Sequence, residues 1–236
     1  MRLMIAVAAL TLLGASAGPP APVAATPVAV ELFTSQGCSS CPPADALFER
    51  LVREPNIIPI TRPVTYWDRL GWKDTLAREE NTALQQAYAA KGGEGSGVYT
   101  PQAVVQGGAG VVGSSESKLR SLIAAEKRVA GPDIRAVATA DGGRTLSIGP
   151  GTKVNANVSI LALKSSATVR IGQGENGGRT VRYTNVLLAE EPIGRWTGSA
   201  ATLSVPGSAM NTPGADRYVV LVRAGTAGRI VAVRYI

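Results

Sequence analysis

Histidine is absent from the chain, and cysteine occurs only twice among its 236 residues. Ser-His-Asp and Cys-His nucleophile systems both need an imidazole base, so the sequence excludes them. Metal and haem sites with histidine ligands are excluded as well, and two thiols are too few for a four-cysteine zinc site. We therefore expect no metal ion and no cofactor, and we expect the chemistry of the protein to depend on Cys38 and Cys41.

Long apolar runs are also missing from the chain. The main apolar stretch, Leu3–Leu13, has eleven residues, whereas a membrane-spanning helix needs about 20. It follows Arg2 and precedes the small-x-small pattern Ala15-Ser16-Ala17, an arrangement that is typical of a secretory signal peptide. We expect residues 1–17 to be the signal peptide and residues 18–27 to be a flexible spacer. The mature protein is then periplasmic or secreted and has no transmembrane span.

Charge of one sign is not concentrated in runs, although the chain carries a formal net charge of +7. Residues 26–131 contain 11 basic and 11 acidic side chains, and residues 132–236 contain 12 basic and 6 acidic ones. The basic residues are spread singly and are not interleaved with aromatics, so we expect no binding to nucleic acid. The excess in the second half favours an anionic envelope surface as a partner.

Between residues 28 and 130, hydrophobic periodicity predicts strands that alternate with helices. Predicted strands cover residues 28–34, 57–65, 102–106 and 111–112; predicted helices cover residues 42–53 and 74–91, and a third begins after Ser114 or Ser115. This is the element order of a thioredoxin fold. We therefore predict a thioredoxin-like α/β domain over residues 28–130.

From residue 131 on, the hydrophobic period changes to two, which is typical of strands. The predicted strands cover residues 134–140, 145–148, 158–163, 168–171, 180–188, 201–205, 218–223 and 229–235. Short strands at this spacing, separated by Gly, Pro, Asn and Asp turns, favour an antiparallel sandwich or barrel. The predicted fold class is thus a thioredoxin-like α/β N-terminal domain followed by an all-β C-terminal domain over residues 131–236.

The most specific motif of the sequence is Cys38-Ser39-Ser40-Cys41, which follows a predicted strand and begins a predicted helix. A helix N-terminus stabilises a thiolate through unpaired N–H groups and a partial positive charge. In this geometry we expect Cys38 to be the more exposed thiol and to attack a partner's disulfide, and Cys41 to resolve the mixed disulfide. The pattern predicts an exported thiol–disulfide oxidoreductase that acts on protein thiols or disulfides with an unidentified redox partner.

Two other interpretations of the cysteine pair remain open. In an exported protein the pair could be a closed structural disulfide, although a four-residue loop restrains the unfolded chain little. A Cu(I) site on both thiolates lacks an obvious third ligand. The alternative function is therefore a non-catalytic envelope protein with a structural disulfide, whose basic β-domain binds an anionic partner.

Several segments together resemble a known family. They are FTSQGCSSCPPAD at residues 33–45, YWDRLGWKD at 66–74, VYTPQ at 98–102 and GENGGRTVRYTNV at 174–186. The chain resembles, over nearly its whole mature length, an exported bacterial family of thioredoxin-like proteins that is known only as a domain of unknown function. The resemblance implies a thioredoxin-like fold and a thiol–disulfide role. Family members often carry a histidine just before the aromatic loop, which is residues 66–72 here; this chain has Arg62-Pro63-Val64 at that place.

The resemblance to thioredoxin-like proteins implies two further site residues, Pro101 and Glu31. Such proteins place a cis-proline beside the dithiol before their third strand, and Thr100-Pro101 falls at that point. Its role is to leave the backbone of the preceding residue free to pair with an extended substrate chain. Thioredoxins also hold a buried acid as a proton relay for the second cysteine, and this is the role implied for Glu31. The alternation of its strand leaves a solvent-facing glutamate as an equal alternative.

Two polar or aromatic segments allow two interpretations each. The aromatics of residues 66–72 could line a substrate groove, but irregularly spaced aromatics more often pack in partly buried positions. Residues 174–179 could form a hairpin tip alone or a patch that contacts the first domain, and the sequence does not decide between them.

Overall fold

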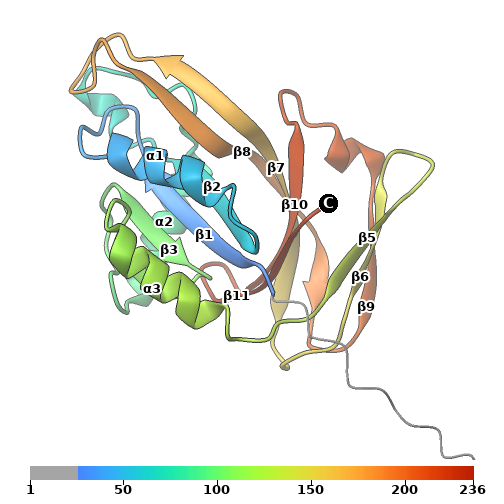
Figure 1. The fold of residues 1–236 in the computed structure, drawn as a ribbon. Helices are drawn as coiled ribbons and strands as arrows, with labels where there is room; N and C mark the ends of the chain where they lie inside the picture. Colours follow the sequence, from blue (N-terminus) through green and yellow to red (C-terminus); the bar gives the residue numbers. More distant parts are fainter. Residues whose placement is uncertain (1–25) are drawn as a thin grey trace, which may run out of the picture.

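The computed structural model describes residues 26–236, whose strands form two sheets (Figure 1). The predicted signal peptide lies outside the described residues, as does most of the predicted spacer. Within the described part, no helix is long and apolar enough to span a bilayer.

The larger sheet has eight strands in the order β11-β10-β7-β8-β2-β1-β3-β4, and the smaller has three in the order β5-β6-β9. The strands are β1 (Val28–Thr34), β2 (Ile57–Pro63), β3 (Gln102–Val105), β4 (Gly110–Val112), β5 (Ile134–Ala138), β6 (Arg144–Ile148), β7 (Ala156–Arg170), β8 (Thr180–Trp196), β9 (Ala201–Val205), β10 (Arg217–Ala224) and β11 (Ile230–Tyr235). The α-helices of residues 26–236 are α1 (Pro42–Leu51), α2 (Glu79–Lys91) and α3 (Glu116–Glu126).

The predicted fold class, a thioredoxin-like α/β domain followed by an all-β domain, is wrong. The described chain is mostly β, and one mixed sheet contains strands from both halves of the sequence. The reason is that β2 pairs with β8 in parallel, with Thr61 opposite Val186. An independent first sheet would end at β2, but here β8 occupies that edge. The hydroxyl of Thr61 strengthens this junction by donating to the carbonyl oxygen of Thr184 at 2.6 Å.

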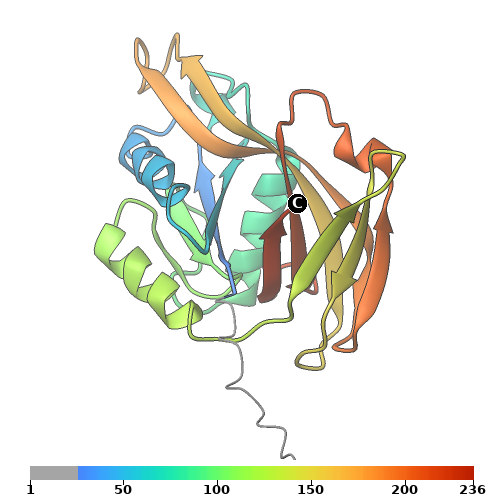
Figure 2. The same cartoon turned by 45° about the vertical axis from the view of Figure 1, so that its right-hand side comes forward.

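Both faces of β1 are covered, which is why every residue of this strand is buried. Val30 and Leu32 pack against α1 and α3 on one face, and Phe33 packs near α2 on the other. Figures 1 and 2 show α1 and α3 together on one side of these strands and α2 on the opposite side. A charged residue on this strand, such as Glu31, therefore needs partners inside the protein.

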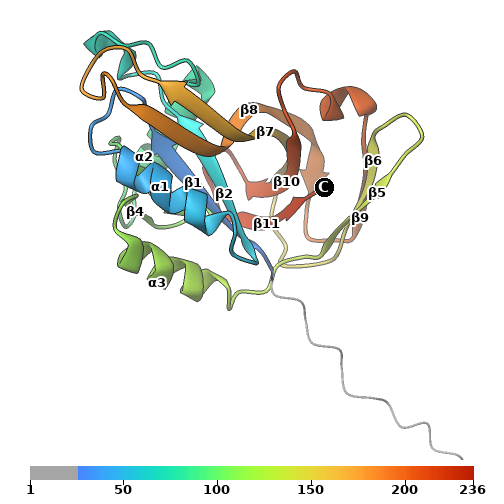
Figure 3. The ribbon, with the colours of Figure 1, turned by 45° about the horizontal axis from the view of Figure 1, so that its top comes forward.

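Strands β7 and β8 form a long antiparallel hairpin, and β7 joins two segments that the sequence predicted as separate strands. One end of the hairpin packs against the three-stranded sheet around the buried side chain of Trp196. The other end extends past the start of α1, as Figures 1 and 3 show for the yellow and orange strands. We call residues 171–179, which connect β7 to β8, the hairpin tip.

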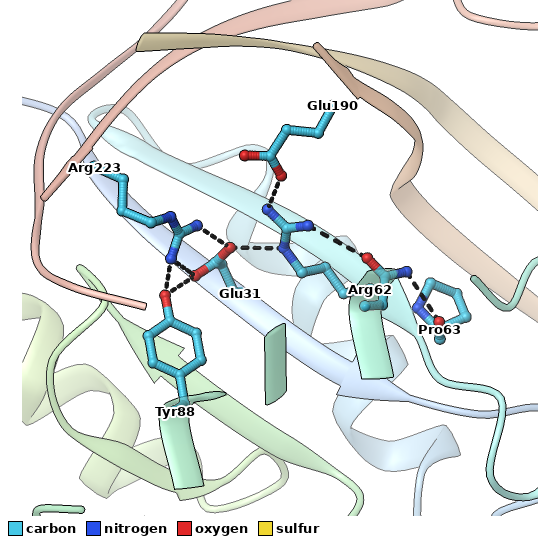
Figure 4. A network of polar contacts seen from close by, with 7 residues as sticks. Glu31, Arg62, Pro63, Tyr88, Glu190 and Arg223 are labelled. Carbon is cyan, nitrogen blue, oxygen red and sulfur yellow. Dashed lines mark hydrogen bonds and ion pairs between the residues drawn. The ribbon is translucent and has the colours of Figure 1, made fainter. Parts of the chain in front are cut away.

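Glu31 belongs to a cluster of charges that is buried except at Glu190 (Figure 4). Its carboxylate accepts hydrogen bonds from Arg62 at 2.6 Å, from Arg223 at 2.7 Å and from the hydroxyl of Tyr88 at 2.6 Å. Arg62 also donates to the carboxylate of Glu190 at 2.8 Å. These five side chains come from β1, β2, β10, α2 and β8, so the cluster connects elements from both halves of the chain.

The arginines decide the charge state of Glu31. Burial on its own raises the pKa of this carboxyl, but the charges of Arg223 and Arg62 outweigh burial and lower the pKa to about 2. A group whose pKa is lower in the folded than in the unfolded protein stabilises the fold above its ordinary pKa, which is 4.5 here. That stabilisation is lost as the pH falls from 4.5 towards 2.

The substitution Glu31→Gln is expected to lower the free energy of unfolding by about 3–5 kcal/mol at neutral pH, because it leaves Arg223 buried without a charged partner. The difference from the wild type should shrink in acid, because there the wild-type carboxylate becomes protonated as well. Urea unfolding followed by circular dichroism over a series of pH values measures both effects.

Glu116→Gln is the matched control, because Glu116 also pairs with two arginines, Arg50 and Arg120, but is exposed. Exposed ion pairs contribute little, so this variant should unfold close to the wild type at every pH. If Glu31→Gln were equally mild, the cluster would not be what holds the two halves together.

Candidate functional site

Cys38 and Cys41 form a disulfide in the segment between β1 and α1, with their Cα atoms 5.4 Å apart. Cys41 is the N-cap of α1, and Pro42 and Pro43 occupy the first helical positions, where a missing N–H costs nothing. The predicted context of the motif, a strand before it and a helix after it, is confirmed. The expectation that Cys38 is the exposed thiol is wrong, because both cysteines are fully buried.

The hairpin tip is hydrogen-bonded to the backbone on both sides of Cys38. Asn176 is itself buried, and its side-chain amide donates to the carbonyl oxygens of Gln36 at 3.0 Å and Cys38 at 2.8 Å. The neighbouring Glu175 accepts a hydrogen bond from the backbone N–H of Ser39 at 3.2 Å. Of the two interpretations of residues 174–179, contact with the first half of the chain is therefore correct.

Two tryptophans, Trp67 and Trp72, contact this segment or residues next to it. The indole N–H of Trp72 donates to the side chain of Gln36, and that of Trp67 donates to the hydroxyl of Thr100, both at 2.8 Å. The Cβ of Trp67 lies close to Gly37, where a Cβ would come within 3.3 Å of it. Both indoles are partly buried. These contacts favour a packing role that fixes the loop around the cysteines.

The Thr100-Pro101 bond is cis, as predicted. The hydroxyl of Ser40 lies 3.5 Å from the carbonyl oxygen of Thr100, so this segment adjoins the C-x-x-C loop. Pro101 itself is buried. Its role in positioning a substrate chain stays a prediction.

Glu31 is buried, so the solvent-facing alternative is wrong. Its contacts disfavour the proton relay that the resemblance implied, because a carboxylate held by Arg62 and Arg223 takes up a proton only near pH 2. Arg62, from the segment where the resemblance implied a histidine, is a member of the same cluster. The contacts of Glu31 and Arg62 therefore indicate a structural role for both residues.

A different buried acid lies at the cysteines, and sequence reasoning missed it. Asp45 in α1 is 3% exposed, and its backbone N–H donates to the carbonyl oxygen of Cys41 at 3.1 Å. Burial raises the pKa of its carboxyl to about 8; the hydrogen bond from Thr34 opposes this rise, and the nearby Asp74 adds to it. The sequence did carry a signal, because Asp45 ends the CSSCPPAD segment one helical turn after Cys41.

Asp74, in the loop before α2, holds the backbone that leads to the cysteines. One carboxylate oxygen accepts the backbone N–H of Gln36 at 2.8 Å, and the other accepts that of Leu76 at 2.8 Å. The sequence predicted a helix over residues 74–91, but α2 begins only at Glu79. Asp74 instead fixes the turn that precedes Gly37 and Cys38.

Comparisons with solved structures find similar folds. The X-ray crystal structure of a protein from Agrobacterium tumefaciens is 29% identical, with a TM-score of 0.78, and the match covers 90% of this chain and 94% of that one. HBP35 of Porphyromonas gingivalis matches with a TM-score of 0.56 over 89% of this chain and 74% of its own, and at 11% identity this shows the fold alone. No curated protein matches the chain.

The family model DUF1223, described as a protein of unknown function, matches residues 29–223. The match covers both the C-x-x-C segment and the hairpin tip. It confirms the resemblance as far as a family of unknown function and leaves its thioredoxin-like character unconfirmed. The chain belongs to the family DUF1223.

Proposed function

We propose that the protein is an exported thiol–disulfide exchange protein that uses Cys38 and Cys41 on the thiols or disulfides of other proteins. The observation that carries this proposal is the disulfide itself, which joins residues three positions apart at the start of a helix. A positive helix terminus favours a thiolate at this place, as redox-active pairs require.

The short loop argues against a purely structural bond. In the loop-entropy model, a cross-link that closes four residues stabilises a fold by about 2 kcal/mol, against almost 5 kcal/mol for a loop of a hundred residues. The burial of both cysteines is the observation that favours the rival, a static disulfide in a non-catalytic protein. A redox measurement separates the two functions.

In the proposed reaction Cys38 is the thiol that attacks and Cys41 the thiol that resolves. Cys38 is followed by the exposed residues Ser39 and Ser40, whereas Cys41 begins a helix that packs on the sheet. The hairpin tip holds the backbone around Cys38, so we expect a partner protein to reach this sulfur when Asn176 releases the two carbonyl oxygens that it holds.

The reduction potential of the Cys38–Cys41 pair is expected to lie between roughly −120 and −270 mV, the range of exchange catalysts. Thiol alkylation after equilibration in graded glutathione buffers measures it. A value below about −300 mV is typical of structural disulfides and would rule out the proposed reaction.

The substitution Asn176→Ala is expected to speed reduction of the disulfide by dithiothreitol roughly 5- to 30-fold, because two hydrogen bonds worth about 1 kcal/mol each no longer hold the hairpin tip closed. Gln173→Ala changes an exposed residue of the same tip and serves as the control. Equal reduction rates in the wild type and both variants would show that the tip does not limit access.

A further inference from the structure

Asp45 and Cys41 lie one helical turn apart. Cys41 has helical backbone angles, and side chains at i and i+4 of a helix lie on the same face. Both residues are buried, on the side of α1 that packs against the sheet. The carboxyl of Asp45 is therefore enclosed on the same helix face as Cys41, the cysteine that starts α1.

One oxygen of this carboxyl has no partner. Oδ1 accepts the hydroxyl of Thr34 in β1 at 2.9 Å, whereas Oδ2 is buried and has no hydrogen-bond partner within residues 26–236. A buried acid with a purely structural task normally has both oxygens satisfied. An unpartnered buried carboxylate oxygen beside a redox pair is instead suited to accept a proton.

The groups that face Asp45 surround its carboxyl with acids and hydroxyls. Asp74, from the loop before α2, and Tyr183, from β8, are the titratable groups that face it, in addition to the Thr34 hydroxyl of β1. Burial and Asp74 raise the pKa of Asp45 to about 8. Glu31 differs because two arginines surround its carboxylate.

We propose that Asp45 accepts the proton of the Cys41 thiol during exchange and returns it when exchange runs in reverse. This inference rests on the proposed function, which it extends by one residue. It assigns Asp45 the role that the resemblance had implied for Glu31, on a different element and on the opposite side of β1.

Oxidation of the reduced pair takes two successive exchange steps. The Cys38 thiolate attacks a partner's disulfide, so that an S–S bond forms between Cys38 and the partner while the partner's own S–S bond breaks and one thiolate leaves. The Cys41 thiol then gives its proton to Asp45, and the Cys41 thiolate attacks the sulfur of Cys38. The Cys38–Cys41 bond forms, the partner's second thiolate leaves, and the partner has gained two electrons.

In the test, the reduced full-length protein is mixed with oxidised glutathione, and the reaction is followed at a series of pH values from acid to alkaline. Acid quenching and mass spectrometry separate attack by Cys38, seen as the glutathione adduct, from closure by Cys41, seen as its loss. For Asp45→Asn we expect closure to slow at least tenfold near neutral pH, within the usual range for a lost acid–base group. We also expect its closure rate to follow only the ionisation of the Cys41 thiol and to lose the contribution of Asp45, while attack by Cys38 stays unchanged.

Two further variants keep the result interpretable. Thr34→Val removes a hydrogen bond that lowers the pKa of Asp45, so its closure profile should move to higher pH without being lost. Glu49→Gln changes a carboxylate on the same helix that pairs with surface arginines, and its profile should match the wild type.

Stability supplies an independent readout of the same carboxyl. The pKa of Asp45 is raised in the folded protein, so wild-type stability should fall as the pH rises from about 4 to about 8. The Asp45→Asn variant should lack this decline, which shows that it is folded and that the carboxyl is buried.

The outcomes distinguish the two claims. Closure by Asp45→Asn with the rate and pH profile of the wild type would overturn the role of Asp45 and leave the proposed function standing. A wild-type protein that forms no adduct with glutathione at any pH would overturn both.

Discussion

The buried charge of Glu31 is the constraint on which the rest of the structure depends. A carboxylate on a strand that is covered on both faces needs cations inside the protein, and the chain supplies Arg62 from β2 and Arg223 from β10. Arg62 in turn needs Glu190 of β8. To neutralise one glutamate, the fold must bring strands from opposite ends of the sequence together, and the junction of β2 with β8 lies at that place (Figure 4).

The composition of the candidate site follows from this junction. Once β8 lies against β2, the β7–β8 hairpin extends past α1 and its tip reaches the C-x-x-C segment. The site therefore combines residues that are far apart in the sequence: Cys38, Cys41 and Asp45 from the first half and Asn176 from the second. An acid that is ionised holds the fold, and a second acid lies beside the cysteines. This second acid, Asp45, has a raised pKa and no cationic partner among residues 26–236. We assign a structural role to Glu31 and a role in proton transfer to Asp45.

Local patterns predicted local structure well, and they failed where distant segments meet. The strand of residues 28–34 and the helix that begins after Cys41 were predicted correctly, because each depends on neighbouring residues. The cis bond at Thr100-Pro101 was also predicted correctly, but from the resemblance to thioredoxin-like proteins. The pairing of β2 with β8 leaves no trace in hydrophobic periodicity, so a second, separate domain was predicted in its place. The direction of Glu31 was undecidable for a related reason: a strand buried on both faces has no polar face to orient it. The contact of Asn176 with the C-x-x-C segment could not be predicted either, because it depends on the same pairing of β2 with β8.

The central claim is that the buried pair exchanges disulfides through Cys38. Reaction of the Cys41→Ser and Cys38→Ser variants with oxidised glutathione, followed by mass spectrometry of the intact proteins, tests it most directly. The account predicts that Cys41→Ser accumulates an adduct of one glutathione on Cys38, because the resolving thiol is missing, and that Cys38→Ser reacts far more slowly. Failure of both variants to form an adduct, or faster reaction of Cys38→Ser, would contradict it.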